Sequence, residues 1–399
     1  MNTAMPAIWL LIVIVGLPQL SETVYTPALP DIARALSASD SWVEYTLTIY
    51  LLGFAVGTLF WGKLSDRFGR KPCLLLGLLI YVLGCIGCYF SPSIEWLLFS
   101  RFVQAFGGST GSVLGQAICR DAFHGPALGK AYATVGSALA FSPAIGPVIG
   151  GIIDEAFGWQ AIFLALIVIG LMVCIAVYAS LPETHPHASK STVSVKDTAI
   201  KLLKDRTVLA YGILVAGGNG IMFSYYAEGS FYLIELLGLS PAIYGASFLT
   251  IASTGILGSW LSRKMLNRLP AETILMRGIW LILLGCFFFS VFTMAFSLIS
   301  ASKLASILLT LGSMMLTTVG IGMTLPNALS LALQNHRQAI GTASSLFGFF
   351  YYMLISALTL GMGSLHNGTL FPMPLYFCGI AMLMWAVSRM WIDFNKRMP

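Results

Sequence analysis

Charged side chains are scarce in this sequence. Asp, Glu, Lys and Arg make up only 10% of the 399 residues, against about 25% in soluble domains. By contrast, 57% of the residues are hydrophobic and the mean hydropathy is +0.84. This composition excludes a soluble globular domain and predicts a polytopic membrane protein. Because one helical span needs roughly 20 apolar residues, the chain has room for about twelve spans with short connections.

Recognisable catalytic, cofactor and metal motifs are also missing. The stretch 125–131 resembles a phosphate-binding loop, but it is one residue short between its glycines and lacks Ser or Thr after Lys130. No cluster of His, Cys and Asp has metal-ligand spacing, and no nucleophile motif is present. We therefore expect no enzyme, no metal, no ATP and no other cofactor. Any uphill process would have to be driven by an ion gradient.

The apolar segments fall into two groups of six, so we predict an all-α fold of 12 transmembrane helices in two six-helix pseudo-symmetric bundles. The expected domains are an N-terminal bundle (1–181), a cytoplasmic linker with a Lys-rich amphipathic helix (182–206) and a C-terminal bundle (207–399). The spans are predicted near 7–30, 42–62, 72–90, 95–119, 129–156, 159–181, 207–237, 241–262, 273–296, 303–331, 339–364 and 371–391.

The distribution of Lys and Arg predicts the orientation. With these spans, all but three of the 22 basic residues fall in the loops and tail of one side. The exceptions are Arg34 and Lys303 on the other side and Arg101 within a span. Because basic loops stay in the cytoplasm, both termini are predicted to be cytoplasmic. The net charge of +6 reflects this asymmetry and implies no nucleic-acid partner.

The stretch from Gly62 to Lys71 separates the second and third spans with a run of charge. It reads Gly-Lys-Leu-Ser-Asp-Arg-Phe-Gly-Arg-Lys, and we expect a short cytoplasmic hinge whose glycines allow a tight turn. This run resembles the signature of the major facilitator superfamily. The resemblance implies a gating latch, in which the aspartate pairs with arginines and with a helix N-terminus. A basic loop that only fixes topology is the alternative. The predicted gating residues here are Gly62, Asp66, Arg67, Gly69 and Arg70.

The fourth span carries Arg101-Phe-Val-Gln104 and ends in Arg120-Asp121, which resembles the same superfamily. A buried arginine without a partner is costly, so Arg101 should face the bundle interior and bind an acid or a carbonyl. The alternative is an arginine near the outer end that reaches the lipid headgroups. Arg120 and Asp121 join the predicted gating set.

The fifth span reads Ser-Pro-Ala-Ile-Gly-Pro-Val-Ile-Gly-Gly over 142–151, which resembles the antiporter signature of drug:proton exporters. Glycines one turn apart let a neighbouring backbone come close, and a proline removes a backbone hydrogen bond and bends the helix. Generic close packing of membrane helices would look much the same. The predicted gating residues of this span are Gly146, Pro147, Gly150 and Gly151.

The first span narrows the family. Its Ser-Glu-Thr-Val-Tyr-Thr-Pro-Ala-Leu-Pro-Asp over 21–31 resembles the Bcr/CflA group of drug-resistance exporters, with Glu22 where many relatives have aspartate. A carboxylate in the bilayer is expensive when ionised and cheap when protonated. Glu22 is therefore the predicted proton carrier, with Arg101 as its coupling partner, and Glu22 and Tyr25 are predicted to contact substrate. Asp31 is expected at the outer surface.

The seventh span contains polar residues that no family motif explains. On a regular helix, positions 224, 225, 228, 231 and 232 share a face, which would place Glu228 among aromatic rings. Such a site attracts organic cations through charge and ring quadrupole. The alternative is that Glu228 is hydrated near the outer interface, as we expect for Glu235. The predicted substrate-binding residues of this span are Asn219, Tyr225, Glu228 and Tyr232.

Together these features predict a proton-coupled secondary transporter that exports small amphipathic, often cationic, compounds by alternating access. The expected partners are a small-molecule substrate, protons and the lipid bilayer of a bacterial inner membrane, with the protein a monomer. Two alternatives remain: a dedicated carrier of one metabolite or siderophore, and a channel or non-transporting membrane receptor.

Overall fold

The computed structural model describes residues 5–184, 195–298, 302–334, 336 and 340–392. Within these residues the chain is helical and contains no strand, which confirms the all-α prediction. Contacts divide the chain into two compact units, Met1–Thr192 and Val193–Pro399. Residues 185–194 of the predicted linker lie outside the described residues, so its amphipathic part is described only from residue 195.

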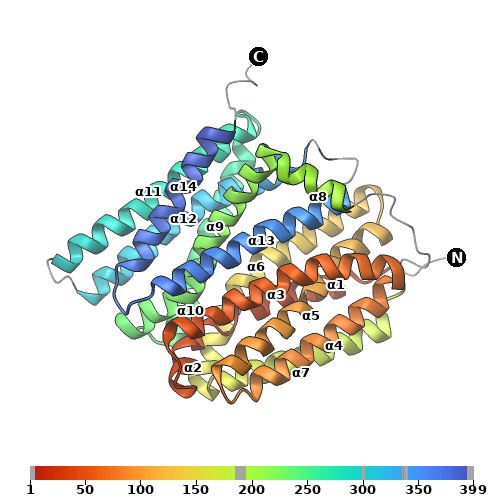
Figure 1. Cartoon of the computed structure of the whole chain (residues 1–399), viewed down its shortest axis with the longest axis horizontal. Helices are drawn as coiled ribbons and strands as arrows, with labels where there is room; N and C mark the ends of the chain where they lie inside the picture. The colour runs from red at the N-terminus through yellow and green to blue at the C-terminus, as the bar shows by residue number, and fades with distance from the viewer. Residues whose placement is uncertain (1–4, 185–194, 299–301, 335, 337–339, 393–399) are drawn as a thin grey trace. The chain divides into compact units, whose positions relative to one another are not determined.

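The first unit contains six long helical segments, which can be followed from red to yellow-green in Figure 1. The first segment is composite, and the other five are continuous helices that pack mainly in the pairs α3 with α5, α4 with α5, α1 with α6 and α4 with α7. The elements are α1 (Ile8–Thr23), η1 (Thr26–Ala28), α2 (Leu29–Ala35), α3 (Asp40–Phe68), α4 (Arg70–Tyr89), α5 (Ile94–Ala122), α6 (Gly125–Phe157) and α7 (Trp159–Ser180).

The second unit begins with the amphipathic helix α8 and then repeats the arrangement (Figure 1). Its packing pairs are α10 with α12, α11 with α12, α9 with α13 and α11 with α14, which are the equivalents of the pairs in the first unit. The elements are α8 (Val195–Lys204), α9 (Arg206–Ser230), the π-helix η2 (Phe231–Leu236), α10 (Pro241–Met265), α11 (Ala271–Leu298), α12 (Lys303–Ala332), α13 (Ile340–Leu365) and α14 (Pro372–Trp391). The two halves are thus internal repeats, as expected for transporters.

Ten of the described helical segments are long and apolar enough to cross a membrane. The remaining two long helices, α5 and α6, occupy the predicted fourth and fifth spans. Every predicted span coincides with one long segment, and most ends agree within a few residues. α8 is too short to span, and its buried residues, Thr198 and Leu202, lie one turn apart on one side.

The first segment is interrupted after Thr23, the residue that follows Glu22, at the boundary between α1 and η1. Pro27 cannot donate to the carbonyl of Thr23, and its ring crowds that carbonyl, so the regular helix ends there. The Thr26 hydroxyl donates to the Thr23 carbonyl instead, at 2.9 Å. The sequence therefore places a local break in the helix beside its buried carboxylate.

The predicted hinge at 62–71 is mostly helical, which corrects the expectation of a loop. α3 continues to Phe68 and α4 begins at Arg70, so only Gly69 lies between them. Gly69 has a φ of 95° and supplies the turn alone. Gly62 lies inside α3, where an added Cβ would meet only an ordinary contact at 3.9 Å. The turn therefore needs one glycine, because the charged residues of the run are compatible with helix.

Candidate functional site

The interior of the first unit holds an acid and a base that are both fully buried. Glu22 on α1 and Arg101 on α5 each have 0% exposure. Neither carboxylate oxygen of Glu22 has a hydrogen-bond partner among the described residues, and Arg101 lies within electrostatic reach of it. Buried polar atoms in proteins are nearly always paired, so an unpaired carboxyl group of this kind marks a candidate functional site.

The contacts of Arg101 orient its guanidinium group, but they pair only some of its hydrogen-bond donors. Its Nη1 donates to Gln104 Oε1 at 2.6 Å and to the Ser21 carbonyl at 3.2 Å, whereas Nε and Nη2 have no partner among the described residues. Its guanidinium lies 4.0 Å from the ring centre of Tyr25 and 4.2 Å from that of Tyr50. The prediction that Arg101 faces the bundle interior and binds a carbonyl is confirmed, and the alternative of a headgroup contact is wrong.

Hydroxyl groups fix the two rings around Arg101. The Tyr25 hydroxyl shares a hydrogen bond of 2.9 Å with Thr46 of α3, and the Tyr50 hydroxyl donates to the Pro18 carbonyl at 2.8 Å. Both rings are 0% exposed. Rings flat against a guanidinium stabilise its charge through their quadrupoles. The positive charge beside Glu22 is therefore part of a rigid, preorganised centre.

The glycines of the fifth span bring α6 against the same region of α1. A Cβ on Gly146 would lie 2.3 Å from the Thr23 hydroxyl oxygen, and one on Gly150 would lie 1.5 Å from the Val24 carbonyl oxygen. The Thr23 hydroxyl donates to the Pro143 carbonyl of α6 at 3.2 Å. Pro147 lies inside α6, which continues through it, and Gly151 is buried. The close approach thus flanks the residues that follow Glu22.

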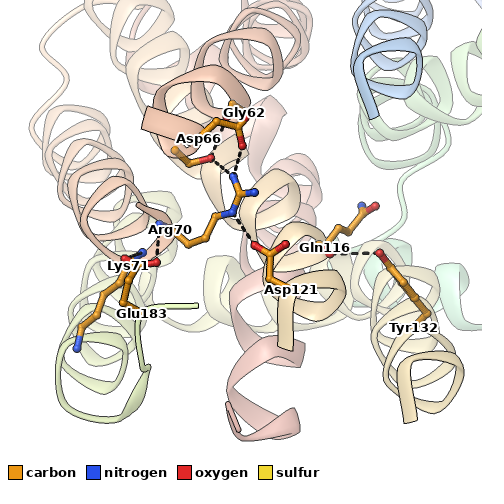
Figure 2. Close-up of polar contacts among 9 residues, drawn as sticks. Gly62, Asp66, Arg70, Lys71, Gln116, Asp121, Tyr132 and Glu183 are labelled. Carbon is orange, nitrogen blue, oxygen red and sulfur yellow. Dashed lines mark hydrogen bonds and ion pairs between the residues drawn. The ribbon is translucent and has the colours of Figure 1, made fainter. Parts of the chain in front are cut away.

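A second charged cluster joins the ends of three helices of the first unit, and its centre is Arg70 (Figure 2). Arg70 Nη1 donates to Asp66 Oδ1 and to the Ser65 hydroxyl, each at 2.6 Å, and its Nε donates to Asp121 Oδ2 at 2.9 Å. The cluster therefore links α3, α4 and α5 through one guanidinium. Asp66 pairs with an arginine as the family resemblance implies.

The N-terminus of α4 is bound by Glu183, a residue that the sequence argument missed. The Glu183 carboxylate accepts from the backbone N–H groups of Arg70 at 3.0 Å and of Lys71 at 3.1 Å, as Figure 2 shows. The Lys71 ammonium donates to the Tyr178 carbonyl near the end of α7 at 2.8 Å. Glu183 follows α7 in the Pro-Glu-Thr run, whose position after the sixth span was the only signal available.

The other predicted gating cations lie outside this cluster. Arg67 is exposed, with its guanidinium 5.2 Å from the ring centre of Phe68, and Arg120 is exposed at the end of α5. Of the gating residues predicted at 62–70 and 120–121, the structure brings together Asp66, Gly69, Arg70 and Asp121. The three charged residues are joined by the contacts above. A Cβ added at Gly69 would lie 2.6 Å from Glu183 Oε2.

In the second unit Glu228 is 1% exposed, so the hydrated position near the interface is wrong. Two of the aromatic rings predicted beside it also pack against neighbouring helices. The ring of Tyr225 lies 5.4 Å from that of Phe248 on α10, and the ring of Tyr232 lies 5.9 Å from that of Phe289 on α11. Tyr232 belongs to the π-helix η2 and lies within electrostatic reach of Glu228.

The sequence argument also missed the partner of Glu228. His366, the residue after α13, has its Nδ1 2.9 Å from Glu228 Oε2 and 3.1 Å from Oε1. Asn219, on the same helix α9, is half-buried and donates to the carbonyl of Val215 at 3.0 Å. Nothing near His366 in the sequence signals this contact, because the two residues are 138 positions apart.

Comparison with known proteins shows to which protein family the chain is similar. The model described as Major Facilitator Superfamily matches residues 11–360. A protein from Rickettsia bellii described as an uncharacterized transporter is 33% identical over 91% of this chain and 90% of its own length. The bicyclomycin resistance protein homolog of Haemophilus influenzae is 30% identical over 83% of this chain and 82% of its own.

A solved structure supports the fold. The xylose transporter XylE from E. coli, in a partially occluded inward open conformation, aligns with a TM-score of 0.74 over 98% of this chain and 99% of its own, at 13% identity. At this identity the likeness concerns the fold alone.

Proposed function

Because the chain belongs to the Major Facilitator Superfamily and is a membrane transporter of small molecules, we propose that it exports drug-like amphipathic compounds in exchange for protons. Glu22 is the proposed proton carrier, Arg101 its coupling partner, and Tyr25 a substrate contact. The proposal rests on the Bcr/CflA-like motifs of the first and fifth spans and on the name of the Haemophilus relative.

The observation that carries the proposal is the unpaired, fully buried carboxyl group of Glu22 beside Arg101. An ionised carboxylate in an apolar interior is costly, and a proton removes that cost. A neighbouring guanidinium makes the ionised form accessible as well. A group that can exist in both states at one place is what coupling to a proton gradient requires.

The break after Glu22 suggests how protonation could reach the substrate pathway. Discontinuous helices in transporters carry binding sites at their interrupted backbone. Here the interruption is followed by Tyr25, whose ring lies against Arg101. A change in charge at Glu22 would alter the field on Arg101 and so the position of Tyr25. Substrate and proton would then compete through one small group of side chains.

The Arg70 cluster is the proposed gating element. It fixes the spacing of the ends of α3, α4 and α5 on the side that the basic loops assign to the cytoplasm. In this proposal both termini face the cytoplasm of a bacterial cell, the membrane is the inner membrane, and the protein acts as a monomer. No metal or organic cofactor takes part, because the proton gradient supplies the energy.

Transport by purified protein in proteoliposomes tests the function. We expect accumulation of several unrelated amphipathic drugs when a pH gradient is imposed, and its loss when a proton ionophore collapses the gradient. Accumulation of one metabolite and of no drug would favour the dedicated carrier. Drug movement that never exceeds equilibrium, with or without the gradient, would contradict proton-driven export.

A further inference from the structure

Asp154, in the last turn of α6, is a buried acid that the proposed function does not use. Only 4% of the residue is exposed, and neither carboxylate oxygen has a hydrogen-bond partner among the described residues. α6 begins just after α5, whose end joins the Arg70 cluster, so Asp154 lies at the far end of α6 from that cluster. Buried polar groups are nearly always paired, and this acid is an exception.

The position of Asp154 along α6 places it on the contact with the first helical segment. Gly150 and Asp154 are four residues apart, so they share one face of the helix. A Cβ on Gly150 would meet the Val24 carbonyl, so this face is turned toward the break after α1. α6 also packs against η1, which follows the break. Asp154 is therefore enclosed between α6 and the irregular part of the first segment.

An ion pair on α2 lies across this contact. Arg34 donates through Nη2 to Asp31 and through Nε to the Pro30 carbonyl at 3.3 Å. The side chain of Arg34 is 71% exposed and that of Asp31 is 39% exposed. Both groups lie within electrostatic reach of Asp154, although Arg34 makes its ion pair with Asp31. A guanidinium has five donors, so Arg34 can also serve a second carboxylate.

The other charged groups around α6 do not replace Arg34 as the cation. Glu155, the next residue, is exposed and has the same sign as Asp154. Neither η1 nor α7, both packed against α6, contains Asp, Glu, Lys or Arg. The only charged residue of α1 is Glu22. The charged residues of α5 are Glu95 at its exposed start, Arg101 in the interior, and Arg120 and Asp121 at the far end.

These surroundings favour a proton on Asp154. An ionised carboxylate that is buried without a hydrogen bond is costly, and the two neighbouring acids add to that cost. The Asp154 carbonyl accepts from the backbone N–H of Gly158 at 2.8 Å, at the C-terminal end of α6, where the helix dipole disfavours negative charge. Arg34 acts in the opposite direction, because its charge stabilises the carboxylate.

We infer that Asp154 is a second proton-binding site of the first unit, and that Arg34 moves from Asp31 to Asp154 when the proton leaves. With the proton bound, Asp154 is neutral and Arg34 pairs with Asp31. When the proton is released to water, the Asp154 carboxylate takes the guanidinium, and Asp31, which is partly exposed, is solvated instead. No bond other than the O–H bond is broken.

The inference deepens the proposed function, on which its role in transport rests. Asp154 lies eight residues beyond Gly146, whose Cβ position is against Thr23, the neighbour of Glu22. Eight residues of helix correspond to about 12 Å. In the proposed orientation Asp154 is at the outer end of this contact, so a proton from outside would bind there before it reaches Glu22.

Proton uptake by the purified protein without any drug tests the site. The pH of a weakly buffered sample is stepped from mildly alkaline to mildly acidic, and the protons bound per protein are counted with an indicator dye. Asp154→Asn, which keeps the shape of the side chain, should take up about one proton fewer than wild type. Glu155→Gln is the matched control and should equal wild type, because an exposed carboxyl group titrates near pH 4, roughly, and stays ionised over this range.

Two further variants test the movement of Arg34. Arg34→Gln removes the charge that favours release, so uptake should move to higher pH with the number of protons unchanged. Asp31→Asn removes a like charge and frees Arg34, so uptake should move to lower pH. A purely structural role of α2 would not give opposite shifts. If Asp154→Asn does not fold, these two variants decide the matter.

Uptake by Asp154→Asn that equals wild type at every pH would overturn the proton site. Shifts in the same direction, or no shift, in Arg34→Gln and Asp31→Asn would overturn the movement of Arg34. In proteoliposomes, Asp154→Asn should slow drug accumulation driven by a pH gradient and retain drug exchange, and normal accumulation would contradict proton entry through this site. Because uptake is counted without drug, failure of the proposed export function would leave that count unchanged.

Discussion

Replacing Gly150 with alanine tests whether the fifth span acts by bringing α6 against α1. The added Cβ would lie 1.5 Å from the Val24 carbonyl oxygen, whereas ordinary contacts begin at 3.4 Å. The obstacle is backbone, which has no rotamer to change. α6 and α1 would have to separate locally by about 2 Å, which loses the close packing that small residues allow.

The magnitude follows from measured costs of overpacking. Extra carbon atoms in a tight interior cost about 1–3 kcal/mol and more when backbone must move, and each 1.4 kcal/mol is about tenfold in an equilibrium. We expect Gly150→Ala to lower the midpoint of thermal unfolding clearly. The transport rate should fall by more than the loss of folded protein explains. Val24 follows Glu22 by two residues, so the shift would also displace the carboxyl group.

The chain supplies a matched control on the same helix. A Cβ at Gly136 would meet nothing within 4 Å, so Gly136→Ala should keep stability and transport, with a gain of up to about 1 kcal/mol from helix propensity. Thermal unfolding of both purified variants, followed by initial transport rates in proteoliposomes, makes the comparison. Wild-type stability and rate in Gly150→Ala would refute the reasoning.

Three further predictions concern the two charged centres. Arg70→Gln should slow transport and lower the free energy of unfolding by about 2 kcal/mol, chiefly because the ion pair with the carboxylate of α5 is lost. Arg67→Gln, at an exposed position, should change neither initial transport rates nor unfolding. Equal effects of the two variants would contradict a specific role for the Arg70 cluster. Gly69→Ala should destabilise by about 1–3 kcal/mol because its φ is 95° and its Cβ would lie 2.6 Å from Glu183; an unchanged unfolding midpoint would show that the turn relaxes freely. Arg101→Lys keeps the charge but loses the planar group between two rings, so its unfolding temperature should drop, and a value equal to wild type would show that the rings contribute nothing.

Much of the fold could be predicted from the sequence because apolar run length is a strong signal. All twelve long segments lie where hydropathy and charge placed them. The stretch at 62–71 was misinterpreted because charge and glycine indicate a loop on average, while Lys, Arg and Asp are compatible with a helix that extends beyond the membrane. Gly69 alone has the backbone angle that interrupts it.

The candidate site could be predicted only in part. Glu22 and Arg101 stand out because an acid and a base within apolar runs are conspicuous, and both are buried in the first unit. Glu183 and His366 could not be predicted, since each lies in a polar connection and meets its partner more than a hundred positions away. Tyr232, which was predicted beside Glu228, lies within electrostatic reach of it although it belongs to a π-helix.

The most direct measurement of the central claim compares two modes of transport in Glu22→Gln proteoliposomes. Exchange of labelled for unlabelled drug needs alternating access but no proton, whereas accumulation against a gradient needs proton coupling. The account predicts that the variant, which keeps the shape of the side chain without its titration, retains exchange and loses accumulation driven by an imposed pH gradient. Accumulation at the wild-type level in Glu22→Gln would contradict it.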